Sequence, residues 1–244
     1  MRRSFRTLLA LAIVAAPAAL VTTPAQAADC TSPAVVEAGV EPTRLVIGST
    51  KTKEFEYYLA LRSNGCAIKT VRATATSADG QGNDWTMEKL DTEGDITFYG
   101  ALISVSPQNL LNADAGSWRT SVQVQWDGPA VVAEEPLKVL RAARVSVNAT
   151  PEPVRKGKTI TIRGDLTRAN WEKGRYAGYP NRPVTLQFKT PGGTYRDVAT
   201  VKSNGSGALK KTVKAAKDGC FRFSYAASST TSGATSGGDC VDVK

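Results

Sequence analysis

The sequence predicts an all-β protein made of two tandem immunoglobulin-like β-sandwich domains after an N-terminal signal peptide. Three observations support this fold class. Many short segments alternate apolar and polar residues with a period of two, as strands with one buried face do. Turn-forming residues such as Gly, Asn and Asp separate these segments. No segment keeps a helical period over three turns, so we expect little α-helix.

The first 27 residues have the composition of an export signal. Three arginines precede an uncharged apolar stretch from Leu8 to Leu20, and small residues lead up to Ala27. We expect cleavage there, so that residues 1–27 are the signal peptide and the mature chain begins at Ala28. Neither this stretch nor a later one reaches the roughly 20 apolar residues of a membrane span. We therefore expect a secreted, extracellular protein, either free or associated with the cell wall, with no transmembrane segment in the mature chain.

Net charge divides the remaining chain into two halves. Residues 28–143 carry 10 basic and 15 acidic side chains, a net charge of −5, whereas residues 144–244 carry 18 and 7, a net charge of +11. The length suits two small cores better than one large core. We therefore expect an acidic sandwich domain at residues 28–141 and a basic sandwich domain at residues 142–244.

The basic domain has the clearer strand pattern. Val184, Leu186 and Phe188, for example, alternate with polar residues, and turns such as Pro191-Gly192-Gly193 lie between such segments. Seven strands are expected, at residues 144–148, 159–163, 184–188, 198–201, 209–213, 221–225 and 241–243. Seven alternating strands in about 100 residues are typical of an immunoglobulin-like sandwich.

The acidic domain is similar but less regular. Its expected strands are residues 44–47, 54–61, 67–73, 96–105, 118–126 and 137–141, with one helical turn within 107–112. The last strand runs directly into the basic domain, so we expect a short linker.

Four cysteines in an exported chain favour disulfide bonds. They are Cys30, Cys66, Cys220 and Cys240, and three pairings of them are open. We favour Cys30 with Cys66 and Cys220 with Cys240, because each bond then lies within one domain.

Much of the basic domain resembles a family of exported actinobacterial proteins with immunoglobulin-like modules. The matching segments are residues 150–159, 164–171, 176–179, 183–188 and 238–243, and residues 45–55 are similar more weakly. The resemblance implies an immunoglobulin-like fold and secretion but no activity, and members are sometimes labelled calcium-binding. This chain has Cys220 and Cys240 where the family tends to have aromatic residues.

Composition argues against an enzyme. The chain has no histidine, which excludes Ser-His-Asp and Cys-His catalysis, and its cysteines are better explained as paired. A pair of carboxylates could cleave glycosides, but any acidic loop offers such residues. We expect no catalytic residue and no required cofactor.

Calcium is the one cation that the sequence leaves open. Acidic residues and glycines gather between residues 79 and 95, and Ca²⁺ prefers several oxygen ligands on a flexible loop. The candidate ligands are Asp79, Asp84, Asp91, Glu93 and Asp95. The segment is not an EF-hand, because Leu90 stands at the twelfth position. The alternative is a solvated acidic loop.

A long insertion at residues 168–182 alternates aromatic and basic side chains. Such a mixture can stack on sugar rings while attracting phosphate or sulfate. The candidate ligand-binding residues are Trp171, Lys173, Arg175, Tyr176, Tyr179 and Arg182. The alternative is that the three aromatic rings fold back and cover an open edge of the sandwich.

These features predict a secreted non-enzymatic binding protein. The partner that best suits a basic extracellular domain is an anionic cell-wall polymer or carbohydrate. Nucleic acid is a weaker partner, because the basic residues are dispersed over many strands. The alternatives are self-association through the oppositely charged domains, calcium binding, and a basic surface that serves only solubility.

Overall fold

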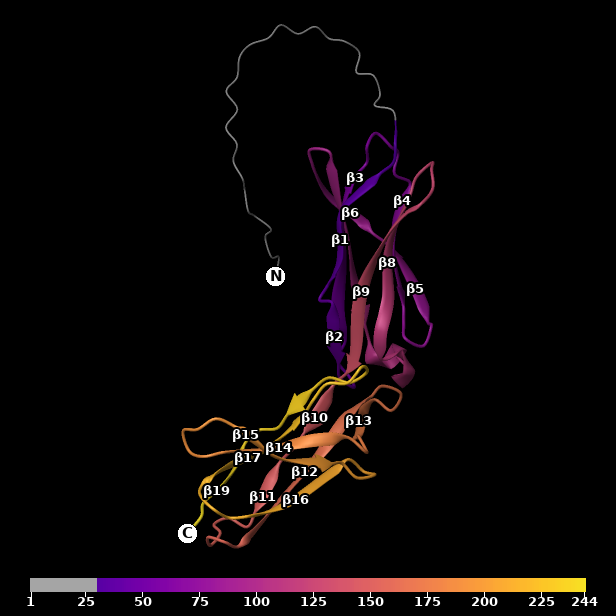
Figure 1. The fold of residues 1–244 in the computed structure, drawn as a ribbon. Coiled ribbons are helices and arrows are strands. Elements are labelled where there is room, and N and C mark those ends of the chain that lie inside the picture. The colour runs from indigo at the N-terminus through magenta and orange to yellow at the C-terminus, as the bar shows by residue number, and fades with distance from the viewer. Residues whose placement is uncertain (1–29) are drawn as a thin grey trace, which may run out of the picture.

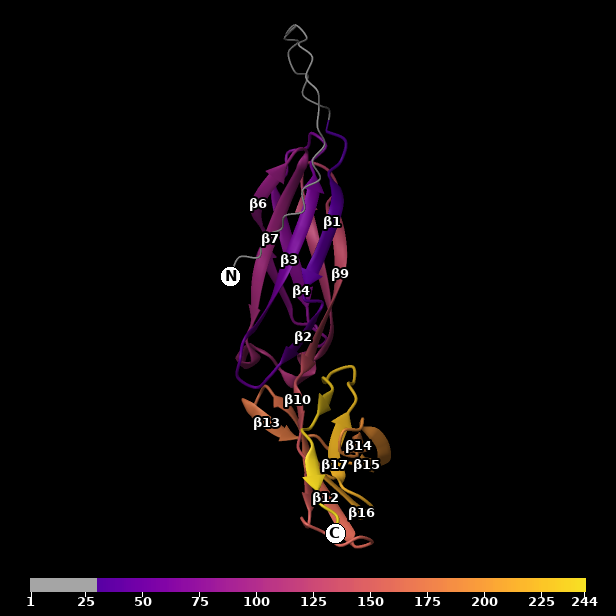
Figure 2. The same ribbon diagram turned by 90° about the vertical axis from the view of Figure 1, so that its left-hand side faces the viewer.

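The computed structural model describes residues 30–244 and consists almost entirely of β-strands (Figure 1). Residues 1–29, which include the predicted signal peptide, lie outside the described residues. Two β-sandwiches follow one another along the chain and meet end to end at a bend, which Figure 1 shows; in the view of Figure 2 they lie in line. The predicted fold class, two tandem immunoglobulin-like sandwiches, is confirmed.

The first domain is built from a four-stranded and a five-stranded sheet. The four-stranded sheet has the order β1-β3-β7-β6, and the five-stranded sheet has the order β2-β9-β8-β4-β5 with β2 and β9 parallel. Their strands are β1 (Ala34–Glu41), β2 (Arg44–Ile47), β3 (Lys53–Arg62), β4 (Thr70–Thr76), β5 (Gly82–Thr86), β6 (Glu88–Glu93), β7 (Ile96–Val105), β8 (Gly116–Gln125) and β9 (Val131–Arg141). Two 3-10 turns, η1 (Pro107–Asn109) and η2 (Asn112–Asp114), connect β7 to β8.

Strand β3 shows how the sequence pattern builds this core. Phe55, Tyr57, Leu59 and Leu61 occupy alternate positions and are each at most 1% exposed. They face side chains of the five-stranded sheet such as Val122, and burial of apolar surface between two sheets is the main stabilising term of a sandwich.

The second domain is organised around its longest strand, β12 (Thr159–Asn170). In one sheet β12 pairs with β10 (Ala143–Val145), β11 (Asn148–Thr150), β13 (Arg175–Gly178) and β16 (Ala208–Lys214). The facing sheet has the order β15-β14-β17-β18, and β19 also pairs with β17. Its strands are β14 (Pro183–Lys189), β15 (Arg196–Lys202), β17 (Gly219–Tyr225), β18 (Ala234–Thr235) and β19 (Asp239–Val241). Ile162, Leu186 and Phe223, all fully buried, belong to the core between the sheets.

Several segments differ from the sequence prediction, and two of them contain the candidate sites. Residues 168–182, expected as an insertion between strands, instead form a β-hairpin in which Asn170 pairs with Arg175, with Gly174 at a φ of 57° in the turn. Residues 79–95, expected as an acidic loop, contain strands β5 and β6. Buried Met87 lies between these strands, and the chain crosses there from one sheet to the other. In the hairpin of residues 168–182, Gly174 forms the turn because the glycine backbone accepts positive φ without strain.

The two domains are joined without a flexible segment. Strand β9 ends at Arg141 and β10 begins at Ala143, so a single residue separates them. Strand pairing between named strands stays within each domain, and an isolated parallel bridge joins Arg141 to Thr231. The linker is therefore as short as the sequence predicts.

Candidate functional site

The first candidate ligand residue, Trp171, lies at the junction of the two domains. It follows β12 in the second domain, is 3% exposed, and packs within the hydrophobic core cluster of the first domain. Its indole Nε1 donates to the carbonyl oxygens of Gly48 at 3.0 Å and Ile47 at 3.3 Å. Trp171 therefore presents no ring face to an external ligand and instead joins the two domains.

Hydrogen bonds around Trp171 reinforce this junction. The side-chain oxygen of Asn112, on η2, accepts from the Trp171 backbone N–H at 3.1 Å, and its amide nitrogen donates to Asn170 at 3.0 Å. In return, the Glu172 carboxylate accepts from the Asn112 backbone N–H at 2.9 Å. These bonds satisfy polar groups that the contact would otherwise leave unpaired.

Arg141 is a buried cation at the same junction. It is 5% exposed, and its Nε donates to the Ala169 carbonyl oxygen at 2.6 Å. Burial, assisted by the nearby positive charge of Arg168, lowers the pKa of Arg141 to about 10. Arg141 is thus a structural residue that ties the end of β9 to the end of β12.

The other two aromatic candidates are also engaged within the protein. Tyr179 is 2% exposed in the second core, with the guanidinium of Arg168 4.1 Å and that of Arg182 4.6 Å from the centre of its ring. Tyr176 is half-buried against the first core, with the Arg144 guanidinium 3.7 Å from its ring centre. The three rings form no common exposed surface.

The basic members of that candidate set remain at the surface. Lys173, Arg175 and Arg182 are exposed, with Lys173 and Arg175 at the turn of the β12–β13 hairpin. They retain the charge that an anionic ligand requires, without the aromatic platform that the sequence predicted beside them.

The structure does not bring the five candidate calcium ligands together. Asp84 lies on β5, at the edge of the five-stranded sheet, and forms a salt bridge with Arg72. Asp91 and Glu93 lie on β6 in the other sheet, and Asp95 pairs with Arg62 at 2.5 Å. Asp79 lies in the turn before β5. Among residues 30–244 no group of three or more His, Cys, Asp or Glu side chains has the arrangement of a metal site.

Both favoured disulfides are present. Cys30 bonds to Cys66, and Cys220 on β17 bonds to Cys240 on β19, where the two residues also face each other in strand register. Each bond closes a loop within one domain, and no cysteine is free in the described chain. The cysteines are therefore structural.

The first domain has an open depression of about 410 Å³ beside η1 and η2. Its buried floor includes Asp114, the one buried acidic side chain of the described chain. Both carboxylate oxygens of Asp114 are occupied: one accepts from the Ser77 hydroxyl at 2.6 Å and the other from the Leu111 backbone N–H at 2.7 Å. The depression thus contains no free carboxylate for acid–base chemistry.

A continuous basic surface extends over the outer face of β12 and β16. In the register of this pair Arg163 lies directly opposite Lys210, and Lys214 lies opposite Thr159 on the same face. Backbone hydrogen bonds of Gly157 and Lys158 with Ala215 hold the preceding turn beside Lys214. We define the basic surface by its six exposed residues: Arg155, Lys156, Lys158, Arg163, Lys210 and Lys214.

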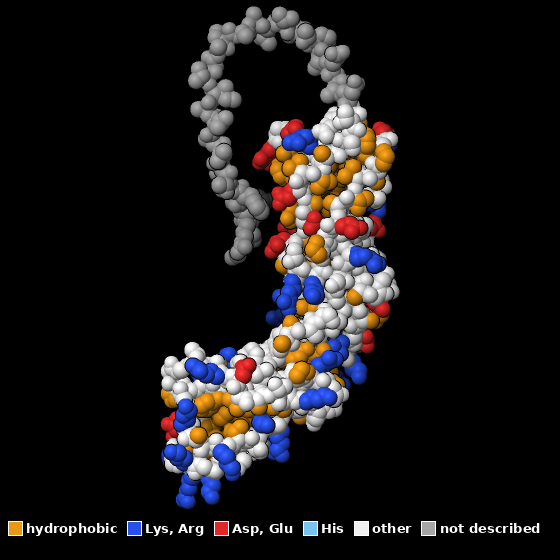
Figure 3. Space-filling model, in the orientation of Figure 1, with side chains coloured by type: hydrophobic (Ala, Val, Ile, Leu, Met, Phe, Trp, Pro, Cys, Tyr) orange, Lys and Arg blue, Asp and Glu red, His pale blue; other side chains and the backbone are white. Residues whose placement is uncertain are grey.

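The cations of this surface have no acidic partner. Lys244 with Asp242 is the only salt bridge within residues 144–244. Several acidic residues of this domain bind backbone N–H groups instead: Asp239 accepts from Ala149, and Asp218 accepts from Val243. Figure 3 shows Lys and Arg side chains gathered over the far end of the second domain. The surface therefore carries positive charge that no salt bridge within the domain neutralises.

Sequence reasoning missed the basic surface as a unit. The alternation of residues 159–163 and 209–213 predicts two strands but not that they are neighbours. Only the register places Arg163 opposite Lys210. Like charges directly opposite in a sheet repel each other, so the pair marks a site of concentrated positive charge. The sequence pattern does not show it, because it depends on the strand register.

Comparison with known proteins identifies no family for this chain. No family model matches the chain, and no curated protein matches it. The I-band fragment I67–I69 of titin aligns with a TM-score of 0.40 and 11% identity over 87% of this chain and 65% of that chain. The Yersinia pseudotuberculosis adhesin InvE aligns with 0.31 and 14% over 85% of this chain and 58% of its own. The D0–D1 domain of intimin aligns with 0.30 and 14%, covering 85% and 98% of the two chains.

These likenesses carry no conclusion about this chain, because identity is low and each TM-score is below 0.5. The chain spans a little over half of the length of the InvE chain. In the described part of the chain no helix is long and apolar enough to cross a membrane. Function must therefore be argued from the residues of this chain itself.

Proposed function

We propose that this chain is an exported, non-enzymatic binding protein whose second domain holds an anionic extracellular polymer on the basic surface. The observation that carries the proposal is the Arg163–Lys210 pair, two cations in directly opposing strand positions with no acidic partner among the described residues. Such a pair costs folding free energy in isolation, and a polyanion that lies across it attracts both cations and offsets their mutual repulsion.

The spacing of the charges suits an extended polymer. Lys210 and Lys214 are four residues apart on β16, which corresponds to about 13 Å at a rise of about 3.3 Å per residue. Lys156 and Lys158 lie in the adjacent turn, which backbone hydrogen bonds hold beside Ala215. A linear polyanion with regularly repeated phosphates or carboxylates can contact several of these cations at once, and each contact releases bound counterions.

Non-enzymatic binding fits the chemistry of the described chain. The sequence has no histidine, and all four cysteines are bonded in pairs. The disulfides and the predicted signal peptide support export. The exposed Lys173, Arg175 and Arg182 add positive charge to the same domain, whereas Trp171 and Tyr179 serve the junction and the core.

Retention on purified cell wall tests the proposal. Replacing Arg163, Lys210 and Lys214 with Gln removes three charges from the basic surface, and we expect at least about a tenfold loss of retained protein at low salt. The matched control replaces Lys51, Lys89 and Lys138 of the first domain with Gln, which changes the net charge equally. Equal loss in both variants would show that only total charge matters and would overturn the assignment to this surface.

A further inference from the structure

The outer face of the β1-β3-β7-β6 sheet carries an exposed hydrophobic surface. Tyr58 on β3 is 38% exposed, Leu90 on β6 is 60% exposed and Leu102 on β7 is 66% exposed. Half-buried Phe98 lies four residues before Leu102 on the same strand, and therefore on the same side of the sheet. We call Tyr58, Leu90, Phe98 and Leu102 the apolar face.

Two glycines allow these side chains to lie flat on the sheet. A Cβ atom added to Gly39 would lie 2.2 Å from the Tyr58 ring, and one added to Gly100 would lie 2.8 Å from Leu90 Cδ1. Gly39 and Gly100 are the strand partners of Tyr58 on its two sides. The ring and the leucine thus lie over bare backbone and form, with Phe98 and Leu102, an exposed apolar patch.

Carboxylates surround the apolar face. The strand register places Glu41 directly opposite Glu56, Glu56 opposite Leu102, and Glu88 opposite Gly100, all on the outer side of the sheet. Glu37, opposite Ala60, completes this acidic rim. None of the four carboxylates forms a salt bridge within the described chain.

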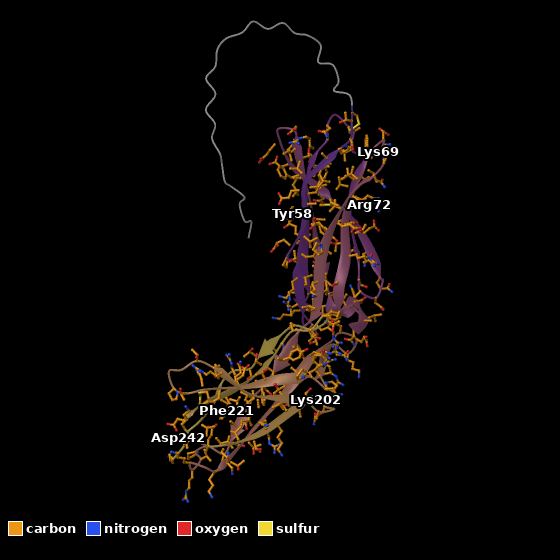
Figure 4. All side chains as sticks on the ribbon, viewed as in Figure 1. Tyr58, Lys69, Arg72, Lys202, Phe221 and Asp242 are labelled. Atoms are coloured by element: carbon orange, nitrogen blue, oxygen red, sulfur yellow. A yellow bond between two sulfur atoms is a disulfide. The ribbon has the colours of Figure 1, made fainter. Side chains whose placement is uncertain are left out.

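The acidic rim affects the ionisation of Tyr58, which lies within it. Partial burial first, and then the nearby carboxylates of Glu37, Glu135 and Glu41, raise the pKa of Tyr58. Figure 4 shows Tyr58 on the opposite side of the first domain from Lys69 and Arg72, so these two cations do not offset the rim. The two negative charges of Glu41 and Glu56 repel each other, just as the two positive charges of Arg163 and Lys210 do.

The complementary surface belongs to the second domain of the same sequence. That domain has a net charge of +11, and Figure 3 shows hydrophobic side chains on it bordered by Lys and Arg. Val198 on β15 is 48% exposed and lies two residues from Arg196. We propose that the apolar face with its acidic rim docks the basic domain of a second copy of this chain.

The partner must be another molecule because the junction fixes the domains of one chain. Trp171 and Arg141 hold the second domain at the end of the first, and Figure 1 shows it bending toward the side of β1, β3 and β6 without covering that face. A contact between the first domain of one copy and the second domain of another is head-to-tail. Such a contact either closes into an antiparallel dimer, in which each copy supplies both surfaces, or continues as an open chain or a larger ring.

This inference rests on the proposed function only through the positive charge of the second domain, because Arg196 and Val198 on β15 belong to the other sheet from Arg163 and Lys210. Replacing residues of the apolar face should abolish self-association and leave polymer retention intact. Replacing residues of the basic surface should reduce polymer retention, and self-association only through the lower positive charge of the domain. The two proposals can therefore fail independently.

Sedimentation velocity of the purified protein tests the docking. At low salt we expect the weight-average sedimentation coefficient to rise with protein concentration, and high salt should reduce the rise. Leu102→Lys should lower the association constant at least about tenfold, since it places a cation where the partner's cations dock. Its matched control is Val132→Lys, which alters a 52% exposed residue of the other sheet and should leave association unchanged.

Three results would overturn the inference. They are a monomer at every concentration in low salt, association of Leu102→Lys at wild-type strength, or equal loss in Val132→Lys. Retention of Leu102→Lys on purified cell wall is measured in parallel. If Leu102→Lys is retained at the wild-type level, any loss of self-association is assigned to the apolar face. If Leu102→Lys loses both self-association and retention, the two surfaces do not act independently.

Discussion

The indole nitrogen of Trp171 lies 3.0 Å from the carbonyl oxygen of Gly48, across the boundary between the two domains. The side chain comes from the second domain, yet it is buried in the core cluster of the first. The two sandwiches therefore share one large residue. Because the linker is a single residue and the contact is buried, the bend between the domains is fixed by packing.

Trp171→Ala should destabilise the protein strongly. Removing a buried tryptophan leaves a cavity and deprives the first core of its contacts, a change that typically costs about 3–5 kcal/mol. Loss of the indole donor also leaves two carbonyl oxygens with one partner fewer. Urea unfolding followed by circular dichroism measures the effect.

Trp126→Ala is the control for this prediction. Trp126 is only half-buried, in the β8–β9 turn, where its Nε1 donates to the Pro129 carbonyl oxygen. We expect a loss of about 1 kcal/mol, as for a single hydrogen bond with modest packing. If both variants unfold at the same urea concentration, Trp171 does not join the domains.

The raised pKa of the Tyr57 hydroxyl leads us to expect that the protein loses stability at alkaline pH. Tyr57 is fully buried, and its hydroxyl donates a 2.6 Å hydrogen bond to the Thr74 carbonyl oxygen. Burial, partly offset by a hydrogen bond with the Thr120 side chain, raises the pKa of Tyr57 well above its ordinary value of 10.0. The folded protein therefore keeps this proton above pH 10.0 while the unfolded chain loses it, and the free energy of unfolding falls as pH rises.

The difference between wild type and Tyr57→Phe isolates this effect. Arg141 acts in the opposite direction over the same range, because its lowered pKa favours the folded state as pH rises above about 10. That contribution is the same in both proteins. Thermal melts from neutral to strongly alkaline pH should show a shallower alkaline decline for Tyr57→Phe. Parallel declines would mean that Tyr57 ionises equally in both states.

The disulfide that closes the longer loop should contribute slightly more to stability. The Cys220–Cys240 bond spans 20 residues and the Cys30–Cys66 bond spans 36. Loop-closure entropy gives about 3 and about 4 kcal/mol respectively. Urea unfolding of the two double-serine variants should show these losses. An undiminished stability in either variant would contradict a structural role for that bond.

Much of the fold could be predicted because it depends on local alternation. Segments 54–61 and 96–105 read as strands, and the structure places β3 and β7 there. Strand β1 escaped prediction because its register shifts between Val35 and Glu37, which interrupts the alternation. Strand β6 escaped because all of its residues are exposed, so no buried periodicity marks it.

The candidate sites were harder to predict because they depend on pairing across long distances. Trp171 looks like a surface aromatic among basic residues, and nothing near it in the sequence indicates Gly48, 123 residues away, as its partner. Similarly, Asp84 and Asp91 are close in sequence, but the chain changes sheets between them. The charge division between the halves was visible from composition, whereas the opposition of Arg163 and Lys210 required the register.

The most direct test of the central claim is the salt dependence of binding to polyphosphate. We predict that the logarithm of the wild-type dissociation constant rises linearly with the logarithm of salt concentration. Replacing Arg163, Lys210 and Lys214 with Gln should make this slope shallower by the amount that corresponds to roughly three lost phosphate contacts. A slope that these replacements leave unchanged would contradict an anion-binding role for the basic surface.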